Sequence, residues 1–128
     1  MKITNLTFYI ALVLGLFALI ALQSNASSSK VYKSLSEALK TPDEVYHLKL
    51  NRKRYKTFPK EILTLKNLVT LDLSNNKLDT LPTGIKELVF LEEVTLKSNR
   101  FNSFPREICT INSLKILKLA NNNISSIP

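Results

Sequence analysis

The residues best suited to catalysis in this sequence are its one histidine, His47, and its one cysteine, Cys109. A cysteine nucleophile needs a base such as histidine within hydrogen-bonding reach. These two residues fall in different copies of an internal repeat, on opposite predicted walls, so they cannot form such a pair. The sequence also has no Gly-rich phosphate loop, no metal-ligand spacing and no isolated pair of carboxylates. We therefore predict a protein that is not an enzyme and that binds no metal and no cofactor. We expect Cys109 to be a half-buried packing residue on the outer wall, although a single thiol could also form an intermolecular disulfide.

The Lys and Arg residues form a second group that could have a function. The chain carries 18 Lys and Arg against 10 Asp and Glu. A basic surface can bind an acidic protein, nucleic acid, anionic polysaccharide or lipid headgroups. The alternative is a solubilising rim, because the charge is spread over the repeat and only Tyr55 is interleaved with it. The candidate basic patch consists of Arg52, Lys53, Arg54, Lys56, Lys77 and Arg100.

An internal repeat of 23 residues must position these side chains. Its clearest copy reads Leu68-x-x-Leu71-x-Leu73-x-x-Asn76-x-Leu78-x-x-Leu81-Pro82-x-x-Ile85-x-x-Leu88. The copies span 45–67, 68–90, 91–113 and 114–128, and the last is shortened. A fixed period of this length indicates a solenoid.

Each copy predicts one strand and one return segment. In "TLDLS", Leu71 and Leu73 face one side and Thr70, Asp72 and Ser74 the other, as a half-buried strand requires. Stacked strands would form a parallel sheet. A proline recurs at the same position of each copy and begins the return segment, as in "PTGIKELVF". These segments predict short helical or 3-10 turns with an isoleucine pointing inward.

Asparagine recurs where each strand ends. Asn76, Asn99 and Asn122 occupy this position in three copies, and Lys53 occupies it in the first. An asparagine side chain offers two donors and an acceptor, so it can satisfy backbone groups that a turn leaves unpaired. We predict a stacked ladder of these side chains that lacks its first member.

These motifs resemble the leucine-rich repeat family, in its 23-residue class with a Leu-Pro-x-x-Ile-x-x-Leu tail. The resemblance covers residues 45–128, about two thirds of the chain. It implies a right-handed α/β solenoid with a parallel sheet on the concave side and short helical or 3-10 turns on the convex side. It also implies non-catalytic binding of a protein partner on the concave face, where our candidate residues are His47, Lys49, Arg52, Thr70, Asp72, Asn75, Glu93, Thr95, Lys97 and Lys118.

Residues 1–26 read as a signal peptide. Lys2 is followed by an uncharged apolar run of 17 residues, Leu6 to Leu22, and by the small-residue site Ser24-Asn25-Ala26. An uncleaved signal anchor is the rival interpretation, because 17 residues is the short limit of a membrane span. The chain is thus expected to be secreted, periplasmic or otherwise extracytoplasmic, or anchored to the membrane.

Residues 27–44 read as a linker and an N-terminal capping helix. Ser34-x-x-Glu37 is a capping-box pattern at the start of "LSEALK", and Thr41-Pro42 ends the helix. A helix at this point would cover the open end of the solenoid. The apolar residues expected on its inner face are Val31, Leu35, Ala38 and Leu39. This segment is similar to the caps of exported bacterial leucine-rich repeat proteins.

The sequence stops just after the turn of the fourth copy, at Pro128. We expect the apolar residues of this copy to be uncovered on one side, so that this end could self-associate. A fragment or a shortened reading frame would explain the missing cap. The leading function is binding of a protein partner. The alternatives are adhesion to an anionic polymer or membrane surface through the basic patch, and a truncated remnant without a function of its own.

Overall fold

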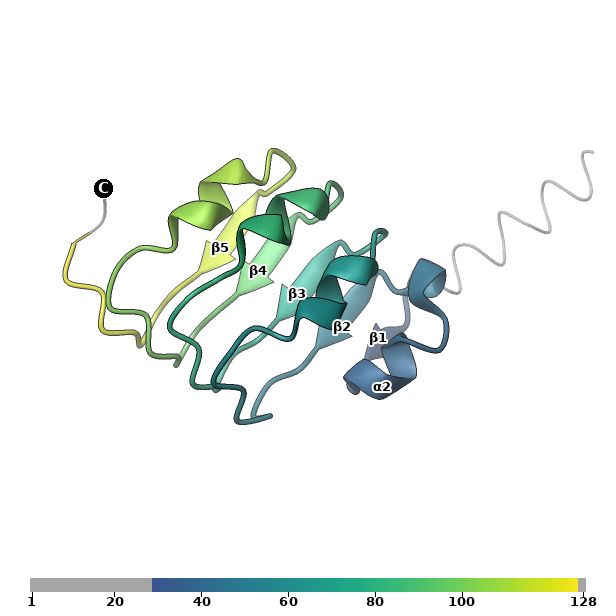
Figure 1. Cartoon of the computed structure of the whole chain (residues 1–128), viewed down its shortest axis with the longest axis horizontal. Coiled ribbons are helices and arrows are strands. Elements are labelled where there is room, and N and C mark those ends of the chain that lie inside the picture. Colours follow the sequence, from purple (N-terminus) through teal and green to yellow (C-terminus); the bar gives the residue numbers. More distant parts are fainter. Residues whose placement is uncertain (1–28, 127–128) are drawn as a thin grey trace, which may run out of the picture.

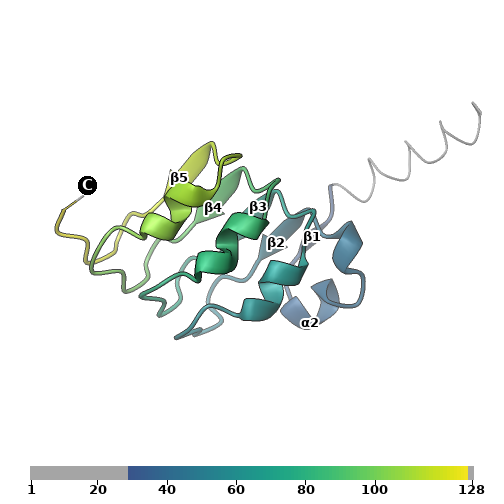
Figure 2. The same ribbon diagram turned by 45° about the horizontal axis from the view of Figure 1, so that its top comes forward.

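The computed structural model describes residues 29–126, in which strands and short helices alternate once per repeat. One parallel sheet holds the strands in chain order: β1 (Val31–Tyr32), β2 (His47–Lys49), β3 (Thr70–Asp72), β4 (Glu93–Thr95) and β5 (Ile116–Lys118). Figures 1 and 2 show these strands side by side, with the short helical turns stacked as a second layer. The sheet and the turns fit the predicted solenoid, and each repeat copy forms one rung of it.

The strands pair at equivalent positions of successive repeats. Thr70 pairs with His47 on one side and with Glu93 on the other. Leu71 likewise lies between Leu48 and Val94. Residues that are 23 apart in the sequence therefore stand side by side in columns, as the repeat predicts.

The second layer consists of 3-10 helices, η2 (Lys60–Thr64), η3 (Thr83–Glu87) and η4 (Arg106–Thr110). Each begins directly after a proline, which therefore precedes the helix instead of occupying its first turn. In η3, the N–H of Ile85 donates to the carbonyl oxygen of Pro82 at 3.1 Å. Proline favours this position because its φ is fixed and it has no N–H to satisfy. The isoleucine of each helix is buried against the sheet.

The core lies between the two layers. Leu71, Leu73, Leu78 and Leu88 of the second rung are all almost completely buried. The corresponding residues of the first and third rungs form the same cluster. The inward register assigned from the sequence is confirmed.

The predicted asparagine ladder joins the rungs where the strands end. The side-chain nitrogen of Asn99 donates to the carbonyl oxygens of Leu96 and Leu73, each at 3.0 Å. Its oxygen accepts the N–H of Leu78 at 3.0 Å. Asn76 and Asn122 make the equivalent bonds to their own rung and to the rung before. Each amide thus satisfies buried backbone groups of two rungs.

The segment before the first rung differs in part from the prediction. β1 was not predicted, and it pairs with β2 through Val31 and His47. The helix α2 (Leu35–Ala38) is followed by a 3-10 turn, η1 (Pro42–Glu44).

Two expectations about α2 are wrong. Ser34 makes no side-chain capping bond, because its hydroxyl pairs instead with the hydroxyl of Ser36 at 2.8 Å. Val31 and Leu39 are exposed, whereas Ala38 and the unpredicted Tyr32 are buried in the core. The helix is a single turn, too short to align four apolar side chains on one face. Its capping role stays a prediction.

The fourth rung is less well buried than the others. Leu114, Leu117, Leu119 and Ile124 are only partly buried, whereas their counterparts in the second rung are buried. Self-association through this end stays a prediction.

Three predicted features lie wholly or partly outside residues 29–126. They are the signal peptide, residues 1–26, the start of the linker segment 27–44, and the last two residues of the fourth copy, Ile127 and Pro128. Within the described residues, no helix is both long and apolar enough to span a bilayer.

The repeat offers a matched test of the core. Leu73 is 0 % exposed, whereas Leu119 occupies the same repeat position in the less buried fourth rung. We expect Leu73→Ala to lower the free energy of unfolding by about 2–5 kcal/mol and Leu119→Ala by clearly less. Chemical denaturation measures both. Equal losses at the two positions would contradict the difference in packing between the rungs.

The asparagine ladder predicts a second stability change. Asn99→Ala removes the hydrogen-bond partners of buried backbone groups in two rungs. Each backbone group left unpaired costs roughly 1–3 kcal/mol of stability. We expect a total loss of about 2–4 kcal/mol on this basis. Asn102→Ala is the control, because Asn102 is exposed in the same turn region. A comparable unfolding midpoint for the two variants would show that the ladder does not hold the rungs together.

Candidate functional site: the sheet face and the basic edge

The solvent side of the sheet carries the first candidate site, which we call the sheet face. Because side chains alternate along a strand, the first and third residues of β2 to β5 point away from the core. The pairing register aligns them in two columns. The sheet face consists of His47, Thr70, Glu93 and Ile116 in one column, and Lys49, Asp72, Thr95 and Lys118 in the other.

Cross-strand contacts fix several of these side chains. Nδ1 of His47 lies 2.9 Å from Oγ1 of Thr70. The ammonium of Lys118 pairs with the carboxylate of Glu93 on the neighbouring strand. These bonds hold polar groups in defined positions before any ligand arrives.

A shallow hollow of about 290 Å³ lies over β3 and β4. Thr70 and Thr95 contribute small side chains to its lining, so the surface is open there. Its lining includes both acidic and basic side chains, so it can pair with ligand groups of either charge. The lining consists of Thr70, Leu71, Asp72, Glu93, Thr95, Lys97 and Lys118.

Three predicted binding residues lie beyond the strands instead of on them. Arg52 and Asn75 occupy the turn after β2 and β3, in the left-handed region with φ of 58° and 56°. Lys97 also follows the end of β4. Ser74, assigned to the solvent side of a strand, is only 8 % exposed. The strands are three residues long, so the predicted alternation ends at the third residue.

The turns that follow the strands form the second candidate site. The turn segments 51–57, 74–80, 97–103 and 120–126 carry seven Lys or Arg and one Asp. All of residues 29–126 carry seventeen Lys or Arg and ten acids. A net charge of +6 out of +7 therefore lies in these turns. We call this strip the basic edge, and its cations are Arg52, Lys53, Arg54, Lys56, Lys77, Lys97 and Arg100.

The cations of the basic edge are available to a ligand. Six of the seven are exposed, and Lys77 is half-buried. Within the described part of the chain, the ion pairs involve other lysines, and none includes a residue of the basic edge. Tyr55 lies between Arg54 and Lys56 and is half-buried. Burial and, to a smaller extent, the charge of Glu61 raise the pKa of its hydroxyl.

Two glutamates also have shifted pKa values, and both lie outside the sheet face and the basic edge. A hydrogen bond from Lys66 at 2.8 Å, together with its charge, lowers the pKa of Glu87. Lys40 lowers the pKa of Glu37 in the same way. Both pairs are exposed on the surface, so they add little to stability.

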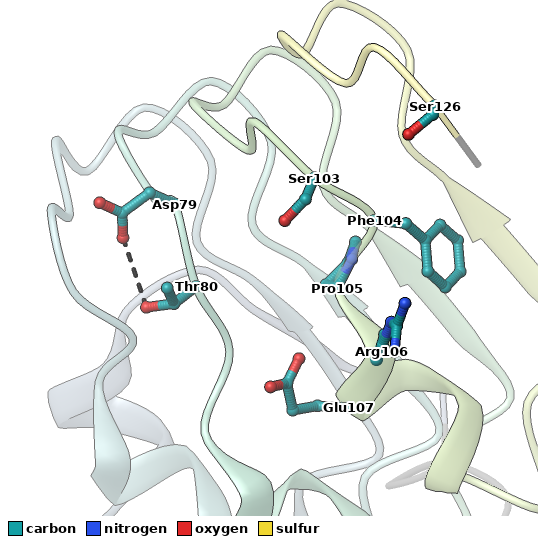
Figure 3. A pocket seen from close by; sticks show the side chains of 8 residues that line it. All are labelled: Asp79, Thr80, Ser103, Phe104, Pro105, Arg106, Glu107 and Ser126. Atoms are coloured by element: carbon teal, nitrogen blue, oxygen red, sulfur yellow. Dashed lines mark hydrogen bonds between the residues drawn. The ribbon is translucent and has the colours of Figure 1, made fainter. Parts of the chain in front are cut away.

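A second hollow, of about 420 Å³, opens where the second, third and fourth rungs turn towards the layer of 3-10 helices. Figure 3 shows Asp79 bonded to Thr80 on one side and Arg106 and Glu107 on the other. Phe104 and Pro105 supply its apolar wall. The hollow has charges but no histidine or cysteine.

The residues considered for catalysis are far apart in the fold. His47 lies on β2, whereas Cys109 lies on η4 in the other layer. Cys109 is exposed, which corrects the prediction of a half-buried packing residue. It follows the buried Ile108, so its own side chain points outward. Among residues 29–126, no group of three or more His, Cys, Asp or Glu could hold a metal ion.

Sequence reasoning missed one surface feature. Val89 and Phe90 are 62 % and 56 % exposed and line a hollow of about 310 Å³. The neighbouring rungs have polar residues at these positions, Lys66-Asn67 and Asn112-Ser113. This break in the repeat was the signal that could have revealed the apolar pair.

Comparisons with known proteins agree with the repeat geometry. The family model described as Leucine Rich Repeat matches residues 67–88. None of the curated proteins matches the chain.

Two similar solved structures have leucine-rich repeats. One is the LRR ectodomain of the plant membrane receptor kinase GASSHO1/SCHENGEN3 from Arabidopsis thaliana, in complex with CASPARIAN STRIP INTEGRITY FACTOR 2. It is 34% identical over 72% of this chain, with a TM-score of 0.54. The other is an LRR protein of Leptospira interrogans, 26% identical over 78% of this chain, with a TM-score of 0.41. The chain spans 11% of the first structure and 37% of the second.

Proposed function

We propose that this chain, a leucine-rich repeat protein, acts as a non-catalytic module that binds a protein partner through its sheet face. The family resemblance predicts this face to be the concave one. The observation that carries the proposal is the hollow over β3 and β4, where small threonines lie among charged side chains. Such a surface offers hydrogen-bond donors and acceptors around an open centre, as a protein contact requires.

The rigidity of the sheet supports the same proposal. Association loses free energy when side chains and loops must become ordered at an interface. Here His47 is already bonded to Thr70, and Lys118 to Glu93. The asparagine ladder holds the rungs beneath them. The face is therefore largely organised in advance of binding.

The plant ectodomain is an analogy for this role. That protein was solved in complex with another factor, so a similar stack of repeats can support recognition. The analogy concerns the repeat fold, because function resides in the particular side chains of the face. The identity of the partner does not follow from it.

We further propose that the segment from β1 to α2 closes the N-terminal end of the core. Tyr32 and Ala38 are buried against it, and the hydroxyl of Tyr32 bonds to that of Thr41 at 3.1 Å. Terminal coverage of this kind is what a solenoid needs. The extracytoplasmic location predicted from residues 1–26 belongs to the same proposal.

Site-specific photo-crosslinking tests the proposed binding face. A photoreactive phenylalanine analogue would replace Thr95 on the sheet face or, as the control, Thr83 on the convex helix η3. We expect a discrete cross-linked protein from native extract only for the Thr95 position. Adding Thr70→Arg should reduce that product about tenfold, the effect of losing roughly 1.4 kcal/mol of binding free energy.

Two outcomes would contradict this function. Equal cross-linking from both positions would indicate non-specific contact. A product that is unchanged by Thr70→Arg, in a variant with an unaltered unfolding midpoint, would place the partner away from the hollow.

A further inference from the structure

We propose that the basic edge docks an acidic segment of the protein partner that the sheet face holds. This inference rests on the proposed function for the identity of the partner as a protein. It adds the chemistry of that partner, which must present clustered carboxylates beside its contact with the sheet.

The first argument is the concentration of charge. The turn segments carry seven cations and a single acid, Asp79, whereas the rest of residues 29–126 has ten cations and nine acids. The cations are also unevenly distributed along the stack, with most of them in the first rung. The turn of the first rung has four cations, the second one, the third two and the fourth none. A solubilising surface would not need this asymmetry.

The second argument is that these cations have no internal task. Within residues 29–126 they make no ion pair, although lysines elsewhere on the surface do. Arg52 and Arg54 project from left-handed backbone positions, with φ of 58° and 62°. Their guanidinium groups can pair with carboxylates through two parallel hydrogen bonds.

The third argument is continuity with the sheet face. Lys97 belongs to the basic edge and also lines the hollow over β3 and β4. Only one residue separates the end of each of β2, β3 and β4 from the turn segment that carries the basic edge. A protein seated on the sheet would therefore extend over the basic edge without further movement.

The geometry of the turns disfavours a phosphate ligand. Proteins commonly bind phosphate with free backbone N–H groups in nests or at helix N-termini. Here the asparagine ladder accepts those of Tyr55, Leu78 and Phe101. Six of the seven cations of the basic edge are exposed, and their charges suit carboxylates carried on a protein.

The turns also lack side chains for stacking on single-stranded nucleic acid and for insertion into a membrane. Single-stranded nucleic acid needs exposed aromatic side chains for stacking. Tyr55 is half-buried, and Phe101 is 1 % exposed. Insertion into a lipid surface needs exposed apolar side chains. The large exposed ones of the described residues, such as Val89 and Phe90, lie outside the turns.

Binding of a deca-glutamate peptide tests this inference. The edge variant Lys53→Glu/Lys56→Glu/Arg100→Glu is compared with the control Lys60→Glu/Lys86→Glu/Arg106→Glu. Both change the net charge equally, but the control changes exposed residues of the convex layer. Titration at low ionic strength should show about a tenfold weaker affinity for the edge variant, since rim charges govern electrostatic attraction. The control should stay within about twofold of the unmodified chain.

Parallel titrations with a 12-base-pair DNA duplex and with phosphatidylglycerol vesicles decide between partner classes. Equal losses of peptide affinity in the edge and control variants would overturn the inference, because net charge alone would explain the binding. An edge-dependent affinity for the duplex or the vesicles that exceeds the affinity for the peptide would overturn it as well. If the edge variant unfolds, Lys53→Gln/Lys56→Gln/Arg100→Gln removes the charge without repulsion.

The peptide titration does not involve the sheet face. Its failure would therefore leave the proposed function intact, and failure of the cross-linking from Thr95 would leave the basic edge intact.

Discussion

The fold depends on the bridging hydrogen bonds of the asparagine ladder. Each side-chain amide serves backbone groups of its own rung and of the rung before it, as Asn99 does with Leu96 and Leu73. A buried carbonyl or N–H without a partner is unfavourable, so this requirement fixes both the turn and the distance between rungs. Among residues 29–126, no buried side-chain nitrogen or oxygen lacks a partner. The strict register of the sheet follows from this constraint.

The first rung shows what happens where the ladder has no member. Lys53 occupies the asparagine position there, and the side chain of Asn76 in the next rung bonds to the N–H groups of Lys53 and Tyr55. In the other rungs one residue per turn has a positive φ, whereas the first rung has Arg52 and Arg54. The same exchange of asparagine for lysine adds a cation to the basic edge. A departure from the structural repeat thus coincides with the highest surface charge.

The sequence predicted the core and the layers well because those features recur every 23 residues. Leu71 and Leu73 faced inward, Ile85 lay in a 3-10 helix, and Asn76 bridged two rungs, each as its position in the repeat implied. Outside the repeat, the sequence predicted a helix, which the structure shows as the single turn α2, but it did not predict the strand before it. β1 has only two residues and depends on pairing with β2, which no local pattern can reveal.

The other errors concern side chains at the limits of an element. Ser34 resembled a helix cap, but its hydroxyl found a closer partner in Ser36. Arg52 and Asn75 were expected to lie on the strands, but they lie in the turns that follow, with left-handed backbone conformations. Local propensity sets these ends only weakly, whereas packing and backbone hydrogen bonds decide them.

The two candidate surfaces differ in the range over which they act. Hydrogen bonds on the sheet face require contact, because they weaken steeply beyond ideal geometry. The charges of the basic edge act over a Debye length, about 8 Å at physiological salt. On the proposed function, the edge therefore governs how fast an acidic partner arrives, and the hollow at Thr70 and Thr95 governs how long it stays. The repeat fold allows the two surfaces to have these separate roles. Surface residues at one repeat position can be substituted while the buried asparagine ladder keeps the other positions in place.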